Sequence, residues 1–303
     1  MKNRFAPGQS LLSLRKKASK TTATRHAGRD VKDEDRGASM TVTVVIPALN
    51  EEGNIGRLIE ETFQAIPRDV LCEVIVIDDG SSDGTGAEIK ALLPAYPKLR
   101  YIRHEEKSGQ SAAVRTGVFA AQSPVIATMD GDGQNDPADI PNLLKKLGVP
   151  GKAGPALVGG VRVKRKTVGS RRIASLVGNK ARNSILRDNC PDSGCGIKVF
   201  WREAHLRLPF FTSMHRFNPA LFLMHGFEVD YHPVNDRPRL AGQSKYTNFN
   251  RALLGIYDMI GIVWLRRRTR VPQITEDSIE AARAKEAAIK LNGAAAHCEA
   301  AEL

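Results

Sequence analysis

The feature that most constrains the fold is a regular alternation, between residues 41 and 160, of short apolar segments with amphipathic ones. The apolar segments are rich in Val and Ile, which favour strands, whereas the amphipathic segments carry apolar residues at helical spacing. The predicted strands are 41–47, 73–77, 99–102, 125–129 and 156–160, and the predicted helices are 54–66, 85–93, 110–121 and 137–147. Strands that alternate with helices in this way predict an α/β fold with a doubly wound, mostly parallel sheet.

Polar loops follow the first, second and fourth predicted strands. Their sequences are PALNEE at 47–52, DDGSSDGT at 78–85 and DGDGQND at 130–136. Because the carboxyl ends of parallel strands share one edge of the sheet, we expect these three loops to form a binding cleft there.

The loop at 130–136 places the side-chain oxygens of Asp130, Asp132 and Gln134 at alternate positions after a buried strand. Two or three such hard ligands suit Mg²⁺ or Mn²⁺ held together with substrate phosphates. A solvated turn is the alternative. A calcium loop of the EF-hand type is excluded, because Asn135 stands where Gly is needed and Pro141 where the bidentate Glu belongs.

The loop at 78–85 begins with two carboxylates, Asp78 and Asp79, that can accept hydrogen bonds from a nucleobase or a ribose. The alternative is a structural role, in which Ser82 or Asp83 caps the next helix. A Rossmann dehydrogenase and a P-loop protein are both excluded, because neither G-x-G-x-x-G nor G-x-x-x-x-G-K-[ST] occurs in its required place.

The formal net charge of +12 over 303 residues implies an acidic partner, such as nucleic acid, an anionic membrane surface or a phosphorylated substrate. The four cysteines lack C-x-x-C spacing, which argues against a zinc site or a disulfide framework and favours a reducing compartment. No apolar run reaches the roughly 20 residues that span a bilayer, and the N-terminus has no apolar core of signal-peptide length.

The second half of the chain is less regular and more basic. A helix is predicted at 171–187 and a strand at 228–234. Residues 250–265 are nearly all apolar and are followed by four arginines, which suits either an interfacial helix on anionic lipid or a helix buried against the sheet. Residues 1–39 form a basic tail of a composition that usually stays disordered.

Six motifs together resemble glycosyltransferase family 2. They are PALNEEGNI at 47–55, DDGSSDGT at 78–85, DGDGQNDP at 130–137, DSGCGIKVF at 192–200, HRFNPAL at 215–221 and RPRLAGQSKY at 237–246. Within that family they are similar to the dolichyl-phosphate and polyprenyl-phosphate sugar transferases, whose type member is dolichol-phosphate mannose synthase. The resemblance covers residues 41–268, and the absence of the Q-x-x-R-W motif favours transfer of a single sugar.

The resemblance implies a glycosyltransferase A-type fold over 40–248, with a nucleotide-sugar half at 40–160 and an acceptor half at 161–248. A membrane-facing amphipathic helix at 249–270 and a tail at 271–303 would follow. It also implies roles for individual residues. The nucleotide sugar would be contacted by Pro47, Ala48, Asn50, Glu51, Asp79 and Asp130. The metal would be held by Asp130, Asp132 and Gln134, and the phosphates by Arg162, Arg216, Arg239 and Lys245. The catalytic residues would be Asp132 and Arg216. Where family members often carry D-A-D, this chain has D-G-D, which leaves the ligands intact. His215 is not predicted to be catalytic.

The implied reaction transfers one sugar, with mannose favoured, from a nucleotide-diphosphate sugar to a polyprenyl or dolichyl phosphate, with metal and with inversion. A lipid monophosphate is largely a dianion at neutral pH, so it needs surrounding cations more than a strong base. The alternative is a hydroxyl acceptor, for which Asp136 or Asp192 would have to serve as base. Nucleic-acid binding is disfavoured, because the chain lacks aromatic stacking platforms and nucleic-acid-binding motifs. The expected location is the cytoplasmic face of a membrane, with peripheral attachment.

Overall fold

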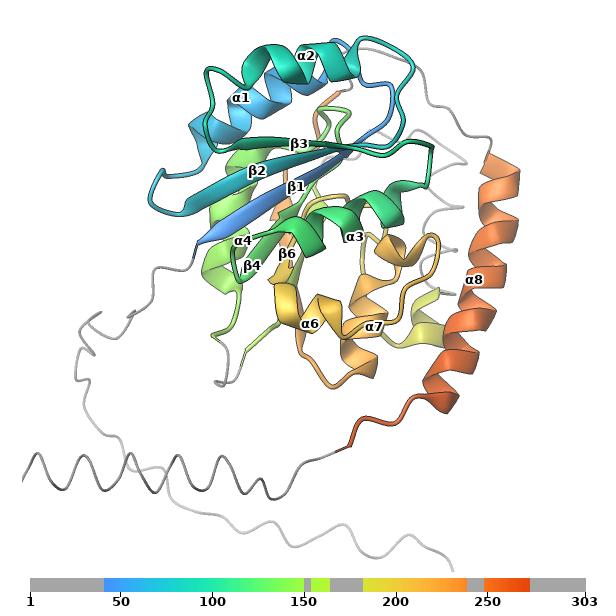
Figure 1. Ribbon diagram of the computed structural model, residues 1–303. Helices are drawn as coiled ribbons and strands as arrows, with labels where there is room; N and C mark the ends of the chain where they lie inside the picture. The colour runs from blue at the N-terminus through green and yellow to red at the C-terminus, as the bar shows by residue number, and fades with distance from the viewer. Residues whose placement is uncertain (1–40, 150–153, 164–181, 239–247, 273–303) are drawn as a thin grey trace, which may run out of the picture. The chain divides into compact units, whose positions relative to one another are not determined.

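The computed structural model describes residues 41–149, 154–163, 182–238 and 248–272, and the side chains of the last range from residue 255 on (Figure 1). Several predictions fall outside the described residues. They are the N-terminal tail, most of the C-terminal tail, most of the helix at 171–187, and the two phosphate ligands Arg239 and Lys245.

The described residues form a seven-stranded sheet in the order β3-β2-β1-β4-β6-β5-β7. All neighbouring strands pair in parallel except β6, which is antiparallel to both β4 and β5. The mostly parallel α/β sheet predicted from the alternating pattern is therefore confirmed. The strands are β1 Val42–Ala48, β2 Leu71–Asp78, β3 Leu99–Arg103, β4 Val125–Thr128, β5 Leu157–Arg162, β6 Lys198–Trp201 and β7 Val229–Val234.

Helices cover both faces of this sheet (Figure 1). Apolar side chains of α1 and α4 join the core on one face, while those of α3, α6, α7 and α8 join the core on the other. The helices are α1 Ile55–Ala65, α2 Thr85–Leu92, α3 Gln110–Ala120, α4 Ile140–Lys146, α6 Arg202–Leu206, α7 Asn218–Met224 and α8 Asn248–Arg268, with short 3-10 helices η1 Pro137–Asp139 and η2 Met214–Arg216.

The near-continuous apolar sequence of β1 follows from burial on both faces. Val44 and Ile46 point into the core that α1 covers, whereas Val45, between them, points into the core that α3 covers. All three are fully buried. A strand in this position cannot show the alternation of polar and apolar residues that marks a half-exposed strand.

The strand β6 was not predicted from the sequence. It is only four residues long, KVFW, and begins with a charged residue, Lys198. Its partners are distant in the chain, since Lys198 pairs with Thr128 of β4 and Gly159 of β5. β6 is thus specified by pairing with β4 and β5 and not by its own pattern.

The sheet has its topological switch point between β1 and β4. The chain builds β2 and β3 on one side of β1 and then crosses over to place β4 on the other side. The loops that leave the carboxyl ends of β1 and β4 therefore diverge, and a crevice opens between them, where ligands of open α/β sheets bind.

The helix α8 has two different sides. Ile262 is buried, and Met259 and Leu265 pack against the core beside it. Tyr257, Ile260 and Trp264, in contrast, are each more than 60% exposed. One side therefore packs against the body of the protein, as one of the two predictions for this segment required, while the other presents apolar side chains to the surroundings. Within the described residues no helix has the length and apolarity needed to cross a membrane.

Candidate active site

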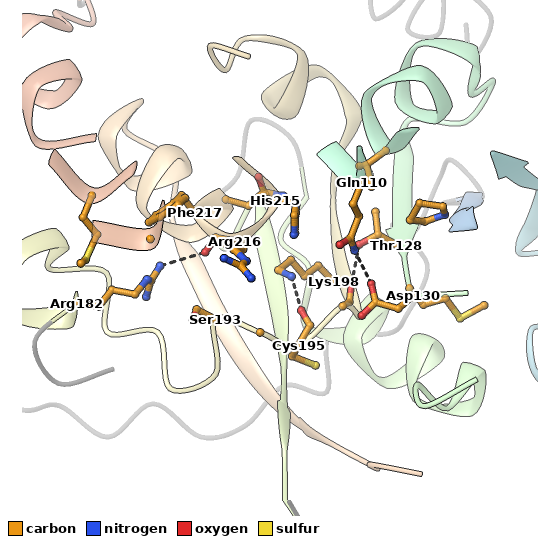
Figure 2. Close-up of a pocket in the computed structure, with 18 of the residues that line it drawn as sticks. Gln110, Thr128, Asp130, Arg182, Ser193, Cys195, Lys198, His215, Arg216 and Phe217 are labelled. Carbon is orange, nitrogen blue, oxygen red and sulfur yellow. Dashed lines mark hydrogen bonds between the residues drawn. The ribbon is translucent and has the colours of Figure 1, made fainter. Parts of the chain in front are cut away.

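A cavity of about 530 Å³ lies at the switch point of the sheet. Its walls come from the ends of β1 and β4, the start of α3, Arg182, the segment 193–198, the residues 215–218 of η2 and the start of α7, and the helix α8 (Figure 2). Asp130 lies at one end, and Ile256 and Met259 of α8 contribute apolar surface. The cavity thus combines a carboxylate, several cations and an apolar wall.

Asp130 follows β4 directly and faces the cavity. One of its carboxylate oxygens accepts a hydrogen bond of 2.7 Å from Nε2 of Gln110, at the start of α3. The backbone of Gly196 lies against the same carboxylate, since a Cβ atom at residue 196 would lie 2.4 Å from Cγ of Asp130. Burial, and next the negative charge of Asp132, raise the pKa of Asp130 above its ordinary value.

The next residues form a tight turn that brings Asp132 near Asp130. The backbone N–H of Gln134 donates to a carboxylate oxygen of Asp132 at 3.1 Å. Gly133, between them, has φ +73°, in the left-handed region that glycine adopts without steric cost. The side-chain amide nitrogen of Gln134 lies 3.5 Å from the backbone oxygen of Arg237.

The donor set fits a divalent cation held partly by the substrate. Burial is the main cause of the raised pKa of Asp130, and the like charge of Asp132 adds to it. A cation between the two carboxylates would relieve their repulsion. No group of three or more His, Cys, Asp or Glu side chains in the described ranges could hold a metal by itself. Mg²⁺ commonly uses only one or two protein carboxylates and completes its shell with substrate phosphates and water.

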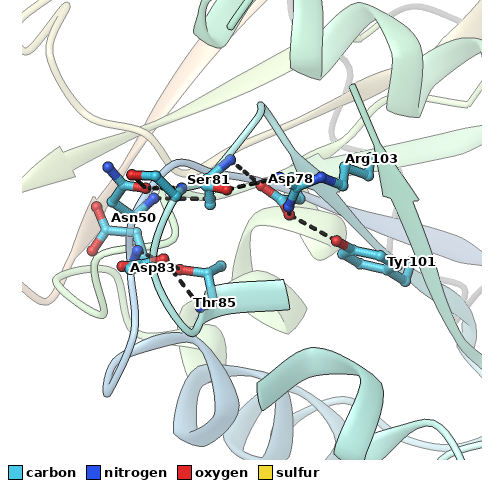
Figure 3. Close-up of polar contacts among 9 residues, drawn as sticks. Asn50, Asp78, Ser81, Asp83, Thr85, Tyr101 and Arg103 are labelled. Atoms are coloured by element: carbon cyan, nitrogen blue, oxygen red, sulfur yellow. Dashed lines mark hydrogen bonds and ion pairs between the residues drawn. The ribbon is translucent and has the colours of Figure 1, made fainter. Parts of the chain in front are cut away.

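The loops after β1 and β2 are fastened to each other (Figure 3). The backbone N–H of Asn50 donates to Oγ of Ser81 at 2.9 Å, and Oδ1 of Asn50 accepts from the N–H of Ser82 at 2.8 Å. The N–H of Glu51 donates to Oγ1 of Thr85. Asn50 has φ +52°, a conformation that Asn tolerates better than most residues. Asn50 and Glu51 therefore help to build the loop that would border the nucleotide.

Asp78, the first of the two carboxylates in the loop after β2, has a structural role. Its side chain is fully buried and accepts hydrogen bonds from the N–H of Ser81 and the hydroxyl of Tyr101, and it pairs with Arg103 (Figure 3). Burial acts to raise the pKa of Asp78, but the hydrogen bonds from Ser81 and Tyr101 and the charge of Arg103 hold it below the ordinary value. This network fixes the end of β2 against β3.

Asp79 anchors the loop that precedes α3. Its carboxylate accepts hydrogen bonds from the backbone N–H groups of Ser108 and Gly109, at 2.9 and 2.8 Å. Nδ1 of His104 lies 2.8 Å from the same carboxylate, and Nε2 of His104 contacts the hydroxyl of Thr116. Asp79 is 3% exposed, so any contact with a nucleotide would be made by a carboxylate that is already held in place.

Asp83 shows a different structural role from the one predicted for it. Its carboxylate accepts from the N–H and the hydroxyl of Thr85, the first residue of α2, at 3.0 and 2.6 Å. Gly84, however, occupies the capping position itself. Asp83 thus stabilises the start of α2 from one residue further away.

Arg216 lies in the wall of the cavity, beside His215. Nδ1 of His215 lies 2.7 Å from the hydroxyl oxygen of Ser111, which also accepts from the backbone N–H of His215 at 3.3 Å. Arg182 donates to the backbone oxygen of Arg216 and forms a buried ion pair with Asp188. The turn that carries Arg216 is thus held from two sides, of which Figure 2 shows the contact with Arg182.

Arg162 is engaged elsewhere. Its guanidinium forms two hydrogen bonds with the carboxylate of Asp192, of 2.7 and 2.8 Å, and the pairing raises the pKa of Arg162 although burial opposes this. The structure does not place Arg162 in the wall of the cavity. The charge of Asp192, one of the two candidate bases, is therefore neutralised by Arg162. The other candidate, Asp136, pairs with Arg237 and accepts a hydrogen bond from the N–H of Ala138.

Three residues in the cavity were missed in the sequence. Gln110 gave no signal, because a single polar residue on a helix is ordinary. Arg182 belongs to the run of basic residues at 162–187, which the sequence favours as a solvated or membrane-facing surface, but the structure buries it. Lys198 did give one, since a lysine between Ile197 and Val199 is unusual in a buried strand. The two remaining predicted residues, Pro47 and Ala48, lie at the end of β1, where Pro47 lines the cavity and the backbone oxygen of Ala48 accepts from the N–H of Asp79.

The fold and the acidic turn at its switch point define a class, the glycosyltransferase A-type proteins. Structures of glucosyl-3-phosphoglycerate synthase from Mycobacterium tuberculosis share this fold. The complex with Mg²⁺ and uridine diphosphate has a TM-score of 0.58 and 19% sequence identity, and the match covers 77% of this chain and 81% of that one. The complex with Mn²⁺, uridine-diphosphate-glucose and glycerol 3-phosphate has a TM-score of 0.59 and 20% identity, over 83% and 88% of the two chains.

Sequence comparison places the chain within that class. Residues 43–208, more than half of the chain, match the family model of Glycosyl transferase family 2. The chain therefore belongs to glycosyltransferase family 2, as its motifs predicted.

Two curated relatives are similar over most of the chain. A dodecaprenyl-phosphate galacturonate synthase from Rhizobium johnstonii is 30% identical over 233 residues, which is 76% of this chain and 68% of that protein. An undecaprenyl-phosphate 4-deoxy-4-formamido-L-arabinose transferase from Salmonella choleraesuis is 31% identical over 227 residues, which is 72% of this chain and 66% of that protein. The chain thus spans about two thirds of the length of each.

Proposed function

We propose that this protein transfers a single sugar from a nucleotide-diphosphate sugar to a polyprenyl phosphate. The observation that carries the proposal is the composition of the cavity, in which Asp130, the cation Arg216 and the apolar wall of α8 line one space. Two relatives named as polyprenyl-phosphate sugar transferases support the same acceptor.

In the proposed reaction, an oxygen of the acceptor phosphate attacks the anomeric carbon and the nucleoside diphosphate leaves, which inverts the configuration. The acceptor is already an anion, so no protein base is required. Asp130, Asp132 and Gln134 would hold Mg²⁺ or Mn²⁺, and the bound ion would neutralise charge on the leaving diphosphate. Arg216 and His215 line the cavity where they would hold the phosphate groups.

The hydroxyl-acceptor alternative is less well supported. It needs a carboxylate base near the donor, and the two candidates, Asp136 and Asp192, are each paired with an arginine. A carboxylate in an ion pair is a weaker base than a solvated one.

The lipid part of the acceptor would leave the cavity along α8. Ile256 lines the cavity and is also 51% exposed, so it connects the apolar wall with the exposed apolar side of the helix. Arg266, Arg267 and Arg268 follow at the end of α8, where they suit an anionic membrane surface. We therefore propose that the protein attaches peripherally to a membrane through this helix.

The sugar is an open part of the proposal. The resemblance to dolichol-phosphate mannose synthase favours mannose, whereas the two relatives are named for galacturonate and formamido-arabinose transfer. A donor panel therefore has to contain both neutral hexoses and these modified sugars.

The test is transfer from a panel of nucleotide sugars to a short polyprenyl phosphate, with Mg²⁺ or Mn²⁺ and with chelator. We expect product from one donor, loss of that product with chelator, and a decrease in kcat of at least about 100-fold in Asp132→Asn, because transition-state charge stabilisation is lost. Asp69→Asn is the matched control, since Asp69 is exposed just before the amino end of β2, at the opposite edge of the sheet. Product with a saccharide acceptor but none with polyprenyl phosphate would refute the proposal.

A further inference from the structure

Among the described residues, two cationic side chains are buried, Arg182 and Lys198, and both line the cavity. The charge of Arg182 is compensated, because two of its nitrogens donate to the two carboxylate oxygens of the buried Asp188. Lys198 is different. It is 6% exposed and forms no ion pair with a carboxylate in the described part of the chain.

The ammonium of Lys198 instead donates to a neutral acceptor, the backbone oxygen of Cys195. Burying an ammonium is unfavourable unless an anion compensates its charge. Asp130 is near enough for its charge to interact with that of Lys198, but its carboxylate already accepts from Gln110 and is also repelled by Asp132. Lys198 therefore lies in a site that an anionic ligand would stabilise.

The backbone of Lys198 is held inside the sheet, so it cannot easily move to bring the charged side chain into water. Lys198 lies between Thr128 of β4 and Gly159 of β5, in the interior of the sheet. The segment before it is held as well, since the hydroxyl of Thr128 donates to the oxygen of Gly196 at 3.0 Å and the N–H of Gly160 to the oxygen of Ile197 at 3.0 Å. The backbone that carries Lys198 is therefore held in place without a ligand, and the ammonium is directed toward the oxygen of Cys195.

We propose that Lys198 is an anion-binding residue of the active site, which contacts a phosphate oxygen of the donor diphosphate or of the acceptor. In the view of Figure 2 its side chain lies between Arg216 and His215 on one side and Asp130 on the other. A fixed ammonium there would bridge the metal-binding end and the cationic turn of η2. The identity of the phosphate rests on the proposed function, whereas the binding of an anion does not.

The test of anion binding is calorimetric titration of inorganic pyrophosphate and inorganic phosphate into the wild type, Lys198→Met and Lys198→Arg. Met has a similar length and no charge, and Arg retains the charge. We expect the dissociation constant for at least one anion to rise about tenfold or more in Lys198→Met and to recover in part in Lys198→Arg, since a hydrogen bond to a charged group is lost and restored. Lys145→Met, which removes an exposed lysine of α4, should bind like the wild type.

A purely structural role predicts the opposite pattern. If Lys198 only holds the oxygen of Cys195, Lys198→Met should lower Tm and leave anion affinity unchanged, and that result would overturn the proposal. We expect Tm to stay the same or rise, because a buried charge that forms no ion pair within the described residues is removed. If Lys198→Met does not fold, Lys198→Gln takes its place, since it retains a donor for that oxygen without the charge. Wild-type protein that binds neither anion would also overturn the proposal.

Kinetics then distinguish the two sources of phosphate. A higher KM for polyprenyl phosphate in Lys198→Met assigns the lysine to the acceptor, and a higher KM for the nucleotide sugar assigns it to the donor. Transfer at the wild-type kcat/KM in this variant would refute the role of Lys198 and leave the proposed function intact. Conversely, anion binding that depends on Lys198, without any transfer to polyprenyl phosphate, would refute only the proposed acceptor.

Discussion

At the scale of single residues, the acidic end of the cavity depends on a glycine that contributes no side chain. The backbone of Gly196 passes so close to Asp130 that a Cβ atom would lie within 2.6 Å of all three atoms of the carboxyl group. Non-bonded atoms cannot approach to this distance, so an added methyl group would displace either the carboxylate of Asp130 or the backbone that leads into β6.

We therefore expect Gly196→Ala to weaken metal-dependent activity by roughly tenfold or more, because misplacement of a catalytic group by about 1 Å has effects of this size or larger. The measurement is kcat as a function of Mn²⁺ concentration. Gly261→Ala is the control, since no atom lies near the corresponding Cβ position in α8. If kcat of Gly196→Ala depends on Mn²⁺ concentration as in the wild type, the close contact between Gly196 and Asp130 is not needed for metal-dependent activity.

A second residue-scale prediction concerns the buried pair Arg182 and Asp188. Asp188 is 2% exposed, and its carboxylate would remain buried and unpaired if the arginine were removed. Breaking such a pair from one side costs about 3–5 kcal/mol, whereas replacing both partners with apolar residues is often much less costly.

Arg182→Met should thus lower the free energy of unfolding by about 3 kcal/mol or more, and Arg182→Met with Asp188→Leu should recover part of this. Denaturant unfolding of the four proteins in this double-mutant cycle measures the coupling. If the decrease in the free energy of unfolding of the double variant equals the sum of the decreases in the two single variants, the two side chains do not interact.

At the scale of elements, α8 does two things at once. Its inner side, with Ile262, completes the core beneath α3, and its outer side carries Tyr257, Ile260 and Trp264 exposed. Leu265, at the end of the apolar segment 250–265, packs toward the core. The membrane hypothesis therefore has to be tested on the outer side alone.

We expect Ile260→Glu combined with Trp264→Glu to reduce binding to anionic phospholipid vesicles by roughly tenfold or more, because two apolar side chains no longer insert and two like charges are added. Vesicle co-flotation measures this. Val149→Glu is the control, as Val149 is exposed but lies outside α8, three residues after the end of α4. Unchanged flotation of the double variant would rule out α8 as the attachment site.

At the scale of the whole molecule, stability should depend on pH through His205. This residue of α6 is 4% exposed and stacks on Phe200 at 4.8 Å. Burial lowers its pKa to about 4, from 6.5. Between these two pH values the unfolded chain binds a proton that the folded protein does not, so this histidine makes the folded state progressively less stable as the pH falls.

Replacing His205 with Phe should therefore flatten the pH dependence of the free energy of unfolding between about pH 6.5 and 4. The full effect of the histidine across this range amounts to about 3 kcal/mol. Urea unfolding at a series of pH values checks it. His104→Phe is no substitute as a control, because His104 contacts Asp79. His225→Phe serves better, since His225 is the half-buried residue that follows α7 and its ring contacts the backbone oxygen of Leu221. If the free energy of unfolding of His205→Phe depends on pH as in the wild type, His205 is not the source of this pH dependence.

Local sequence pattern predicted the first part of the fold well. The strands and helices between residues 41 and 147 were each found within a few residues, because apolar spacing and strand-favouring Val and Ile are properties of neighbouring residues. The acidic turn at Asp130 and Asp132 was placed at the carboxyl end of its strand for the same reason. The reversed strand β6 was missed, since its stability comes from pairing with β4, about 70 residues earlier in the chain.

The sequence by itself thus determined the layer architecture, the family and the acidic turn. Only the tertiary structure decided which charges are available in the cavity. It paired Arg162 with Asp192, enclosed Asp78 among Tyr101 and Arg103, and brought Lys198 to the cavity without a carboxylate partner among the described residues. Whether a charge is neutralised depends on contacts across long separations in the chain, and these form only when the sheet assembles.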